Sequence, residues 1–322
     1  MEILSPSRIR KLGEDPSRCS HAVEFGPIDF SRPFIPEEFT QLYFTPLYSE
    51  LTREQRLRYN QLFGLKVNEQ VAVFEEDFSD RLLVRLARHP TIAAETDLRV
   101  CLERMIDEER RHSEMFHDLN RLCLPEIYRD RDRHFLRMGW PDRLAFTVLT
   151  SAPYRLTFLL WFTTCMEEYS IGLSRVFIKN RQTETLGPLE RNFVRIHAEH
   201  AKDETRHVHT ALNLIDICQA AGWKVKRRIN AALYRQLIRN IVVPRRWGAA
   251  VIRHLLEDCP ELKPMGDRMI RAVRDLKDDE QFQKSLFNRT LMPYTFQHLD
   301  AQPEFENLGD VMLGYDRPKA ER

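Results

Sequence analysis

The sequence predicts an all-α protein whose core is a bundle of four long helices. Only 11 glycines occur among 322 residues, and the 17 prolines fall largely at the chain ends and between long periodic segments. Within those segments, apolar residues recur with the period of a helix that buries one face. No segment has the alternation of a strand or the turn residues of a hairpin, so we expect no sheet.

Prolines separate the four helices of the predicted bundle. Thr52 and Gln55 form a capping box that opens the first helix, whereas Pro153 is expected to disturb the third. The predicted helices span about 52–89, 91–120, 141–179 and 187–220.

The whole chain, 1–322, is predicted to be a single domain. A proline-rich, irregular arm precedes the bundle, and further helices are expected to buttress it. The predicted parts are an arm over 1–38, a metal-binding bundle over 50–220, buttressing helices within 224–299 (224–241, 246–257 and 265–296) and a mobile tail over 300–322.

Composition argues against several classes of function. A net charge of +1 does not point to nucleic acid or an anionic membrane. The longest apolar run, LTFLLWFTTCM, has eleven residues and three threonines, which is short of a membrane span. The six cysteines form no CxxC pair, and the first residues lack the apolar segment of a secretion signal. We therefore expect a cytoplasmic protein without nucleic-acid or membrane partners.

The stretch HAEHAKDETRHVHTAL in the fourth helix combines histidines with acids. His200, Glu204 and His207 fall within a helical sector of roughly 60° and can converge on one metal ion. Imidazole and carboxylate ligands suit iron, zinc or manganese. His197 lies at the edge of this sector, and His209, on the opposite side, is expected at the surface.

The second helix repeats this spacing. EERRH contains Glu109 and His112, and DETRH contains Glu204 and His207 at the same offsets. Two-metal sites in four-helix bundles take an ExxH pair from each of two helices and one Glu from each of the others. The first and third helices should therefore each contribute a glutamate.

The neighbours of each acid decide between adjacent candidates. Glu75 shares its helix face with apolar residues, whereas Glu76 aligns with polar ones. By the same criterion Glu168 is preferred in the third helix, with Glu167 as the alternative. These choices place Glu75 and Glu168 at the site.

A third ExxH pair tests this criterion. Glu114 and His117 share a charged face of the second helix, which predicts exposure to solvent. Glu109 and His112 instead share a face with apolar residues, where burying an acid and a histidine is costly unless a metal ion compensates.

Charged residues beside the ligands have a predicted supporting role. Glu108 and Asp203 each precede a ligand glutamate and are expected to accept a hydrogen bond from the outer nitrogen of a ligand histidine on the facing helix. Arg111 or Arg206 would balance that acid.

With its two acid-ExRH motifs the chain resembles the ferritin-like diiron carboxylate proteins, and most of all the p-aminobenzoate (arylamine) N-oxygenase family. That family has a further histidine one turn before the second ExxH, which gives the pattern HxxxExxH. His200, Glu204 and His207 match this pattern. The resemblance spans roughly residues 50–220. The resemblance implies two iron ions held by seven ligands: Glu75, Glu109, His112, Glu168, His200, Glu204 and His207.

The resemblance also implies a function. The family uses O2 to oxidise an aromatic amine to hydroxylamine, nitroso or nitro products, in secondary metabolism such as antibiotic biosynthesis. It implies a small aromatic amine substrate. We also expect an external electron donor of the ferredoxin or flavin reductase type, and a homodimer. Gly172 is expected to leave space at the cluster. Phe78, Met105, Phe116 and Trp161 are candidates for the wall of an apolar pocket, but the pattern favours plain core for each of them.

Three alternatives remain open from the sequence. A related diiron hydroxylase or desaturase would act at carbon rather than nitrogen. A ferritin-like protein would bind or store iron without oxidising an organic substrate. A structural bundle would bind no metal at all.

Overall fold

The computed structural model describes residues 2–220, 223–244 and 246–317. Within these ranges the chain is built of helices, and the only β pairing is an isolated bridge between Gln182 and Pro188. The all-α expectation is confirmed. No helix in the described part is long and apolar enough to cross a membrane.

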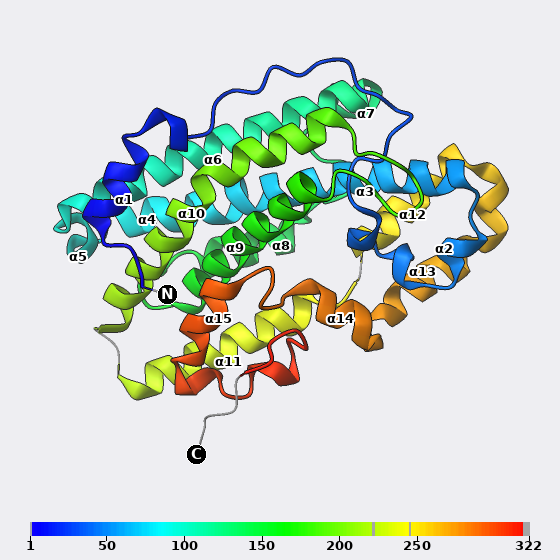
Figure 1. Cartoon of the computed structure of the whole chain (residues 1–322). Helices are drawn as coiled ribbons and strands as arrows, with labels where there is room; N and C mark the ends of the chain where they lie inside the picture. Colours follow the sequence, from blue (N-terminus) through cyan, green and yellow to red (C-terminus); the bar gives the residue numbers. More distant parts are fainter. Residues whose placement is uncertain (1, 221–222, 245, 318–322) are drawn as a thin grey trace.

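Four long helical runs lie side by side and form the bundle (Figure 1). The first run consists of α3 (Arg53–Val73), a π-helical segment η4 (Phe74–Ser79) and α4 (Asp80–Ala87), and the other three are α6 (Thr96–Cys123), α9 (Phe158–Lys179) and α10 (Arg191–Ala220). α10 packs on both α9 and α6, and α3 packs on α6. The first run begins with the predicted capping box, in which Thr52 and Gln55 bond each other's backbone.

The third predicted helix is two helices. α8 (Trp140–Leu149) and α9 are separated by a non-helical segment that contains Pro153, which lacks the N–H that a continuing helix needs. The expected disturbance at Pro153 is therefore a complete break. The short α5 (Pro90–Ala93) likewise separates the first and second runs.

The arm and the tail are more ordered than the sequence predicts. The expected irregular arm contains α1 (Pro6–Gly13), which packs on α6 and α10 and buries Ile9. In the expected mobile tail, Leu308 and Tyr315 are buried in the core. Residues 318–322 of that tail lie outside the described part.

The C-terminal helices pack against the first and third helical runs. Their bounds are α11 (Lys224–Ile241), α12 (Arg246–Asp258), α13 (Gly266–Asp275), α14 (Glu280–Leu286) and α15 (Pro293–Asp300). The predicted helix over 265–296 is thus three helices, because Asp279 caps the start of α14 and Pro293 starts α15. Short helical segments are η1 (Pro16–Arg18), η2 (Glu37–Phe39), η3 (Leu42–Phe44), α2 (Leu47–Glu50), α7 (Pro125–Tyr128), η5 (Pro260–Met265), η6 (Leu276–Asp278), η7 (Pro303–Phe305) and η8 (Leu308–Asp310).

The bundle interior has two apolar clusters rather than one. Phe78 and Met105 belong to one cluster, whereas Phe63 and Phe116 belong to the other. Buried acids and histidines of the same helices fall between these residues in the sequence. The described structure thus places a polar centre in the middle of an apolar core, where charged groups require compensation.

Candidate metal centre

Seven buried acids and histidines from the four helical runs form the polar centre. They are Glu75 of η4, Glu109 and His112 of α6, Glu167 of α9, and His200, Glu204 and His207 of α10, each at most 2% exposed. The π-helical segment that carries Glu75 is a local departure from α geometry of the kind often found at functional sites.

These side chains approach one another closely enough to share metal ions. Three overlapping groups have ligand atoms within 4.8 Å of each other: Glu75, His112 and His200; Glu109, His112 and His207; and Glu167, Glu204 and His207. The first group contains the additional histidine, His200, whose Nε2 is 3.0 Å from Glu75 Oε1 and 3.0 Å from Glu204 Oε1.

Unpartnered atoms in the centre fit bound cations. Glu204 Oε2 and the Nδ1 atoms of His112 and His207 are buried without a hydrogen-bond partner, as are Glu109 Oε2 and Glu167 Oε1. A buried polar atom without a partner costs free energy, and coordination of a metal ion removes that cost. Carboxylate oxygens with imidazole nitrogens are the ligand set of non-haem iron.

The pKa values of the buried glutamates also indicate that the centre binds cations. Burial raises the pKa of Glu109 to about 8, and burial together with Glu109 and Glu204 raises the pKa of Glu167 well above its ordinary value. Burial alone would also raise the pKa of Glu204, but His200 and His207 outweigh it and hold that pKa well below its usual range. The buried carboxyl groups of Glu109 and Glu167 therefore need nearby cations to be ionised together.

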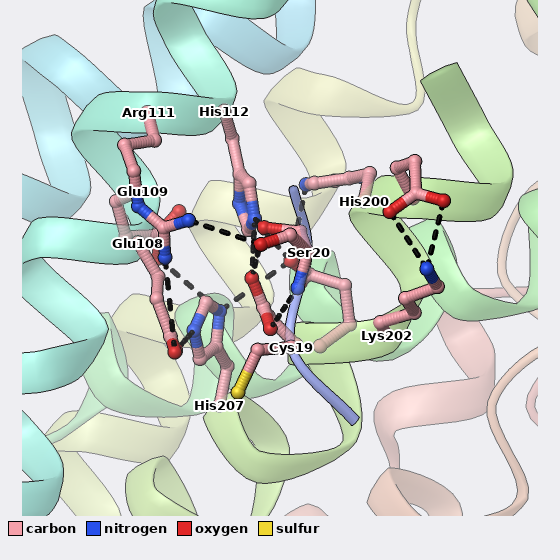
Figure 2. Close-up of polar contacts among 12 residues, drawn as sticks. Cys19, Ser20, Glu108, Glu109, Arg111, His112, His200, Lys202 and His207 are labelled. Carbon is pink, nitrogen blue, oxygen red and sulfur yellow. Dashed lines mark hydrogen bonds and ion pairs between the residues drawn. The ribbon is translucent and has the colours of Figure 1, made fainter. Parts of the chain in front are cut away.

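The outer nitrogens of two histidines are held by acids, as predicted. His112 Nε2 is 2.9 Å from Asp203 Oδ2, and His207 Nε2 is 2.9 Å from Glu108 Oε2 (Figure 2). Each acid sits on the helix facing its histidine, so the two pairs cross between α6 and α10. This arrangement leaves Nδ1 of each ring directed at the centre.

Arg206 balances both of these acids. Its Nη2 donates to Glu108 Oε1 at 2.7 Å and to Asp203 Oδ1 at 2.5 Å. Arg111, the alternative, is 3.9 Å from Glu108 and donates instead to the Ser20 carbonyl. Of the two predicted arginines, Arg206 makes the close contacts.

Ser20 is a contributor that the sequence analysis missed. Its N–H donates to Asp203 Oδ1 at 2.9 Å, and its hydroxyl lies 2.5 Å from Asp203 Oδ2 and 3.3 Å from His112 Nε2. Figure 2 shows Ser20 beside this network on the N-terminal segment. A lone serine far away in sequence gives no signal that it would fold against the centre.

Glu168 lies away from the centre, contrary to the preferred choice. Its two oxygens accept hydrogen bonds from the backbone N–H groups of Tyr294 and Thr295, at 2.7 and 2.6 Å. It therefore satisfies the free N–H groups in the first turn of α15. The alternative, Glu167, faces the centre, with one oxygen 3.8 Å from His207 Nδ1.

Two other histidines of α10 differ from expectation. His209 is buried rather than at the surface, because Leu4 of the N-terminal arm covers it and donates its N–H to Nδ1 at 3.3 Å. His197 is fully buried between Phe116 and Phe177, and both its ring nitrogens lack a partner. Neither residue belongs to the groups of close ligand atoms.

The third ExxH pair is half as predicted. Glu114 is exposed, but His117 is buried and bonds Glu76 Oε1 at 2.7 Å. Glu76 thus points away from the centre, as its polar neighbours in the sequence predict.

Gly172 does not leave space at the cluster, because a Cβ there would lie 2.7 Å from the Leu291 carbonyl oxygen. The missing side chain instead admits the backbone of Leu291.

A cavity of about 180 Å³ opens onto the centre. Glu75, Glu167 and His200 line it, and Lys66 and Gln70 of α3 add polar groups along it. Its apolar walls include Phe63, Phe74, Tyr169, Leu173, Phe177 and Phe287. Phe78, Met105, Phe116 and Trp161, the candidates for a pocket wall, do not line this cavity and are packed in the core, as the sequence favoured for each of them.

The fold and this centre define a class of protein. A four-helix bundle with paired ExxH motifs and one further glutamate from each of two other helices is the arrangement of ferritin-like dimetal carboxylate proteins. The family model of p-aminobenzoate N-oxygenase AurF matches residues 26–250, well over half of the chain. The chain therefore belongs to this family of diiron N-oxygenases. No curated protein sequence matches it.

Proposed function

We propose that this chain uses two iron ions and O2 to oxidise the nitrogen of a small aromatic amine to the hydroxylamine, and onward to nitroso or nitro products. The observation that carries the proposal is the shared wall between the cavity and the centre. Glu75, Glu167 and His200 belong to both, so a ligand in the cavity touches the groups that hold the irons.

The proposed iron ligands are Glu75, Glu109, His112, Glu167, His200, Glu204 and His207. Four carboxylates balance the charge of two ferrous ions, and their neutralisation explains how four acids can be buried together. When bound, the diiron centre supplies electrons to O2 and an oxygen atom to the substrate. Glu167 replaces Glu168 as the proposed ligand from α9, because both oxygens of Glu168 accept hydrogen bonds from backbone N–H groups of α15.

His200 has a defined protonation in this assignment. A ring that binds iron through Nε2 carries its proton on Nδ1, and Nδ1 lies 3.1 Å from Ser170 Oγ. The ring can donate a hydrogen bond from Nδ1 to the Ser170 hydroxyl. This bond fixes the plane of the ring where the cavity meets the centre. Ser170 thereby acts as a positioning residue for His200.

The cavity orients the substrate by its polarity. We propose that the amine lies at the end formed by Glu75 and His200, with the ring against Tyr169 and Phe177. Lys66 precedes Glu75 by nine residues, about 13 Å of helix rise. Its Nζ lies 2.6 Å from Gln70 Oε1, on the side nearer the centre. Lys66 would hold an anionic substituent opposite the amine.

The reaction requires an outside reductant. Converting R–NH2 and O2 to R–NHOH and H2O consumes two electrons and two protons, and the aromatic amine does not supply them. We therefore propose an external electron donor of the ferredoxin or flavin reductase type. Protons reach the site from solvent or from that donor system.

We further propose a homodimer that forms through α8. Trp140, Leu144 and Val148 are exposed and recur at four-residue intervals, so they form one apolar row. α8 contains one acid and one base in its sequence, so two copies can meet across a two-fold axis without charge repulsion.

A single-turnover assay tests the proposed function. The iron-loaded protein is reduced chemically, freed of reductant and exposed to O2 with 4-aminobenzoate, aniline or cyclohexylamine. The proposal predicts N-oxidised products from the aromatic amines, with 4-aminobenzoate favoured over aniline, and none from cyclohexylamine. Ring hydroxylation, or iron oxidation without any organic product, would point to the carbon-oxidising or iron-storing alternative.

A further inference from the structure

The outward face of α11 combines two rows of side chains that no function described so far uses. Val225, Ile229 and Leu233 are exposed at four-residue intervals and form an apolar row. A row of cations lies beside it, because residues spaced by four, seven or eleven share one side of a helix. That row consists of Lys224, Arg228, Arg235 and Arg239. Trp223, at the N-cap of α11, is the most exposed large apolar residue of the described chain, at 84%.

Most of the positive charge of this face has no ion-pair partner among the described residues. α11 contains six basic residues and no acid, whereas the whole chain has a net charge of only +1. Arg235 pairs with Asp310 at 3.2 Å at one edge. No acidic side chain in the described ranges forms an ion pair with Lys224, Arg228 or Arg239. A concentrated, unbalanced patch attracts an oppositely charged partner.

The position of α11 connects this surface to the metal centre. α11 packs directly on α9, with Asn230 accepting the N–H of Phe158 at 3.0 Å. Tyr234 and Ile238 bury their side chains in the same apolar cluster as Cys165 of α9. Glu167, two residues beyond Cys165, faces the centre. One helix therefore separates α11 from the iron ligands, and Figure 1 shows α11 beside α9 at the edge of the molecule.

We propose that the outward face of α11 is the docking site for an acidic electron-carrier protein. The proposal rests on the proposed function, which needs two electrons from outside for each oxygen atom inserted. A one-electron carrier docks twice: each visit oxidises one carrier and reduces one ferric ion to ferrous. Cations steer the carrier, and the apolar row beside them excludes water from a small, short-lived contact.

Two other occupants fit this face less well. A second copy of the chain would bring two sets of unpaired cations together across a two-fold axis, which is repulsive. A lipid surface takes up a helix by burying a broad apolar face, but Val225, Ile229 and Leu233 form a row only one residue wide. An acidic protein matches both the cations and the narrow row.

Direct binding tests the proposal without relying on catalysis. The probe is an acidic plant-type ferredoxin, titrated by calorimetry into the iron-free protein without amine. Arg228→Glu/Arg239→Glu should weaken ferredoxin binding by about tenfold or more at low ionic strength. Added salt should also weaken binding by the parent protein. Arg271→Glu/Arg274→Glu on α13, which reverses two exposed charges elsewhere, should bind like the parent. The neutral Arg228→Gln/Arg239→Gln should fall between.

Reduction of the loaded protein supplies a second readout. Under anaerobic conditions, reduced ferredoxin should convert the diferric parent to the diferrous form faster than the Arg228→Glu/Arg239→Glu variant. Dithionite with a small mediator should reduce both at the same rate, which shows an intact centre. These readouts need no amine, so they are independent of the single-turnover test of function.

Three outcomes would overturn the proposal. Equal ferredoxin binding by both charge-reversed double variants would remove the special role of α11. Binding to vesicles containing phosphatidylglycerol, lost in Arg228→Glu/Arg239→Glu, with no ferredoxin binding, would assign the face to a lipid surface. A change from dimer to monomer on Ile229→Gln in sedimentation velocity would assign it to a second copy.

Discussion

His207 Nε2 lies 2.9 Å from Glu108 Oε2, and the pair joins α10 to α6 directly behind the metal centre. The same relationship recurs between His112 and Asp203, in the opposite direction across the two helices. Because each acid holds the outer nitrogen, the inner nitrogen of each ring is left for iron. The two rings are therefore oriented by acids that contact their outer nitrogens.

Neutralising one of these acids should weaken iron binding. In Glu108→Gln the His207 ring loses a charged acceptor, and Arg206 loses one of its two acids, so iron affinity should fall by about 10–100-fold. Equilibrium binding of Fe²⁺ under anaerobic conditions measures this. Glu103→Gln, on an exposed side of α6, should keep the parent affinity. Equal affinity in all three proteins would contradict the supporting role.

Glu167 and Glu168 should have opposite effects when each is replaced by alanine. Glu167→Ala removes a proposed ligand, so the iron content of the purified protein should fall sharply. Glu168→Ala should keep its iron but unfold more easily, by roughly 1–3 kcal/mol, because two N–H groups of α15 lose a charged acceptor. Metal analysis with urea unfolding separates the two effects. Iron loss in Glu168→Ala with a fully loaded Glu167→Ala would restore the original preference for Glu168.

Replacing His200 should change the chemistry more than the iron content. Six proposed ligands remain in His200→Ala, so both irons should still bind, although less tightly. Loss of a neutral donor alters the electron density at the centre, so arylamine oxidation per iron should fall and the Mössbauer spectrum should change. His209→Ala, which removes another buried histidine of α10, should leave both unchanged. Unchanged turnover per iron in His200→Ala would exclude His200 as a ligand.

Lys66 should make the affinity for anionic amines depend on pH. Burial lowers the pKa of the Lys66 ammonium to about 8, so the cation is present below that pH and is lost above it. The KM for 4-aminobenzoate should therefore rise as pH increases through about 8, whereas the KM for uncharged aniline should not. Lys66→Met should raise the KM for 4-aminobenzoate at the lower pH and remove this dependence. Lys179→Met, at an exposed position on α9, is the matched control.

The contrast between Glu75 and Glu168 explains what the sequence could predict. Glu76, beside Glu75, pairs with Arg133 and His117 on the outer side of its helix, so apolar neighbours correctly identify the inward acid. α9 is buried on several sides, because α10, α11 and α15 all pack against it. Apolar neighbours therefore do not show which side of α9 faces the centre. Polar neighbours instead indicate which side of α9 faces the centre, because Ser170 and Ser174 lie on the same side of the helix as Glu167.

Contacts made by distant segments account for the other differences. Leu4 covers His209, and Ser20 donates a hydrogen bond to Asp203. Both residues belong to the N-terminal arm, whose composition does not predict that it packs on the bundle. The division of the C-terminal helices depends on local caps that a long apolar pattern obscures. The ExxH pairs and their flanking acids were predictable because each lies within one helix, where spacing determines facing.

The fate of the oxygen atom tests oxidation at nitrogen most directly. The chemically reduced, iron-loaded protein is mixed with 4-aminobenzoate and O2 labelled with a heavy oxygen isotope, and the product is analysed by mass spectrometry after one turnover. Oxygenation at nitrogen predicts 4-hydroxylaminobenzoate, or the nitroso compound that excess O2 forms from it, with the labelled oxygen on nitrogen and in proportion to the loaded diiron centres. Unlabelled product, label on the ring carbon, or no product from fully loaded protein would contradict it.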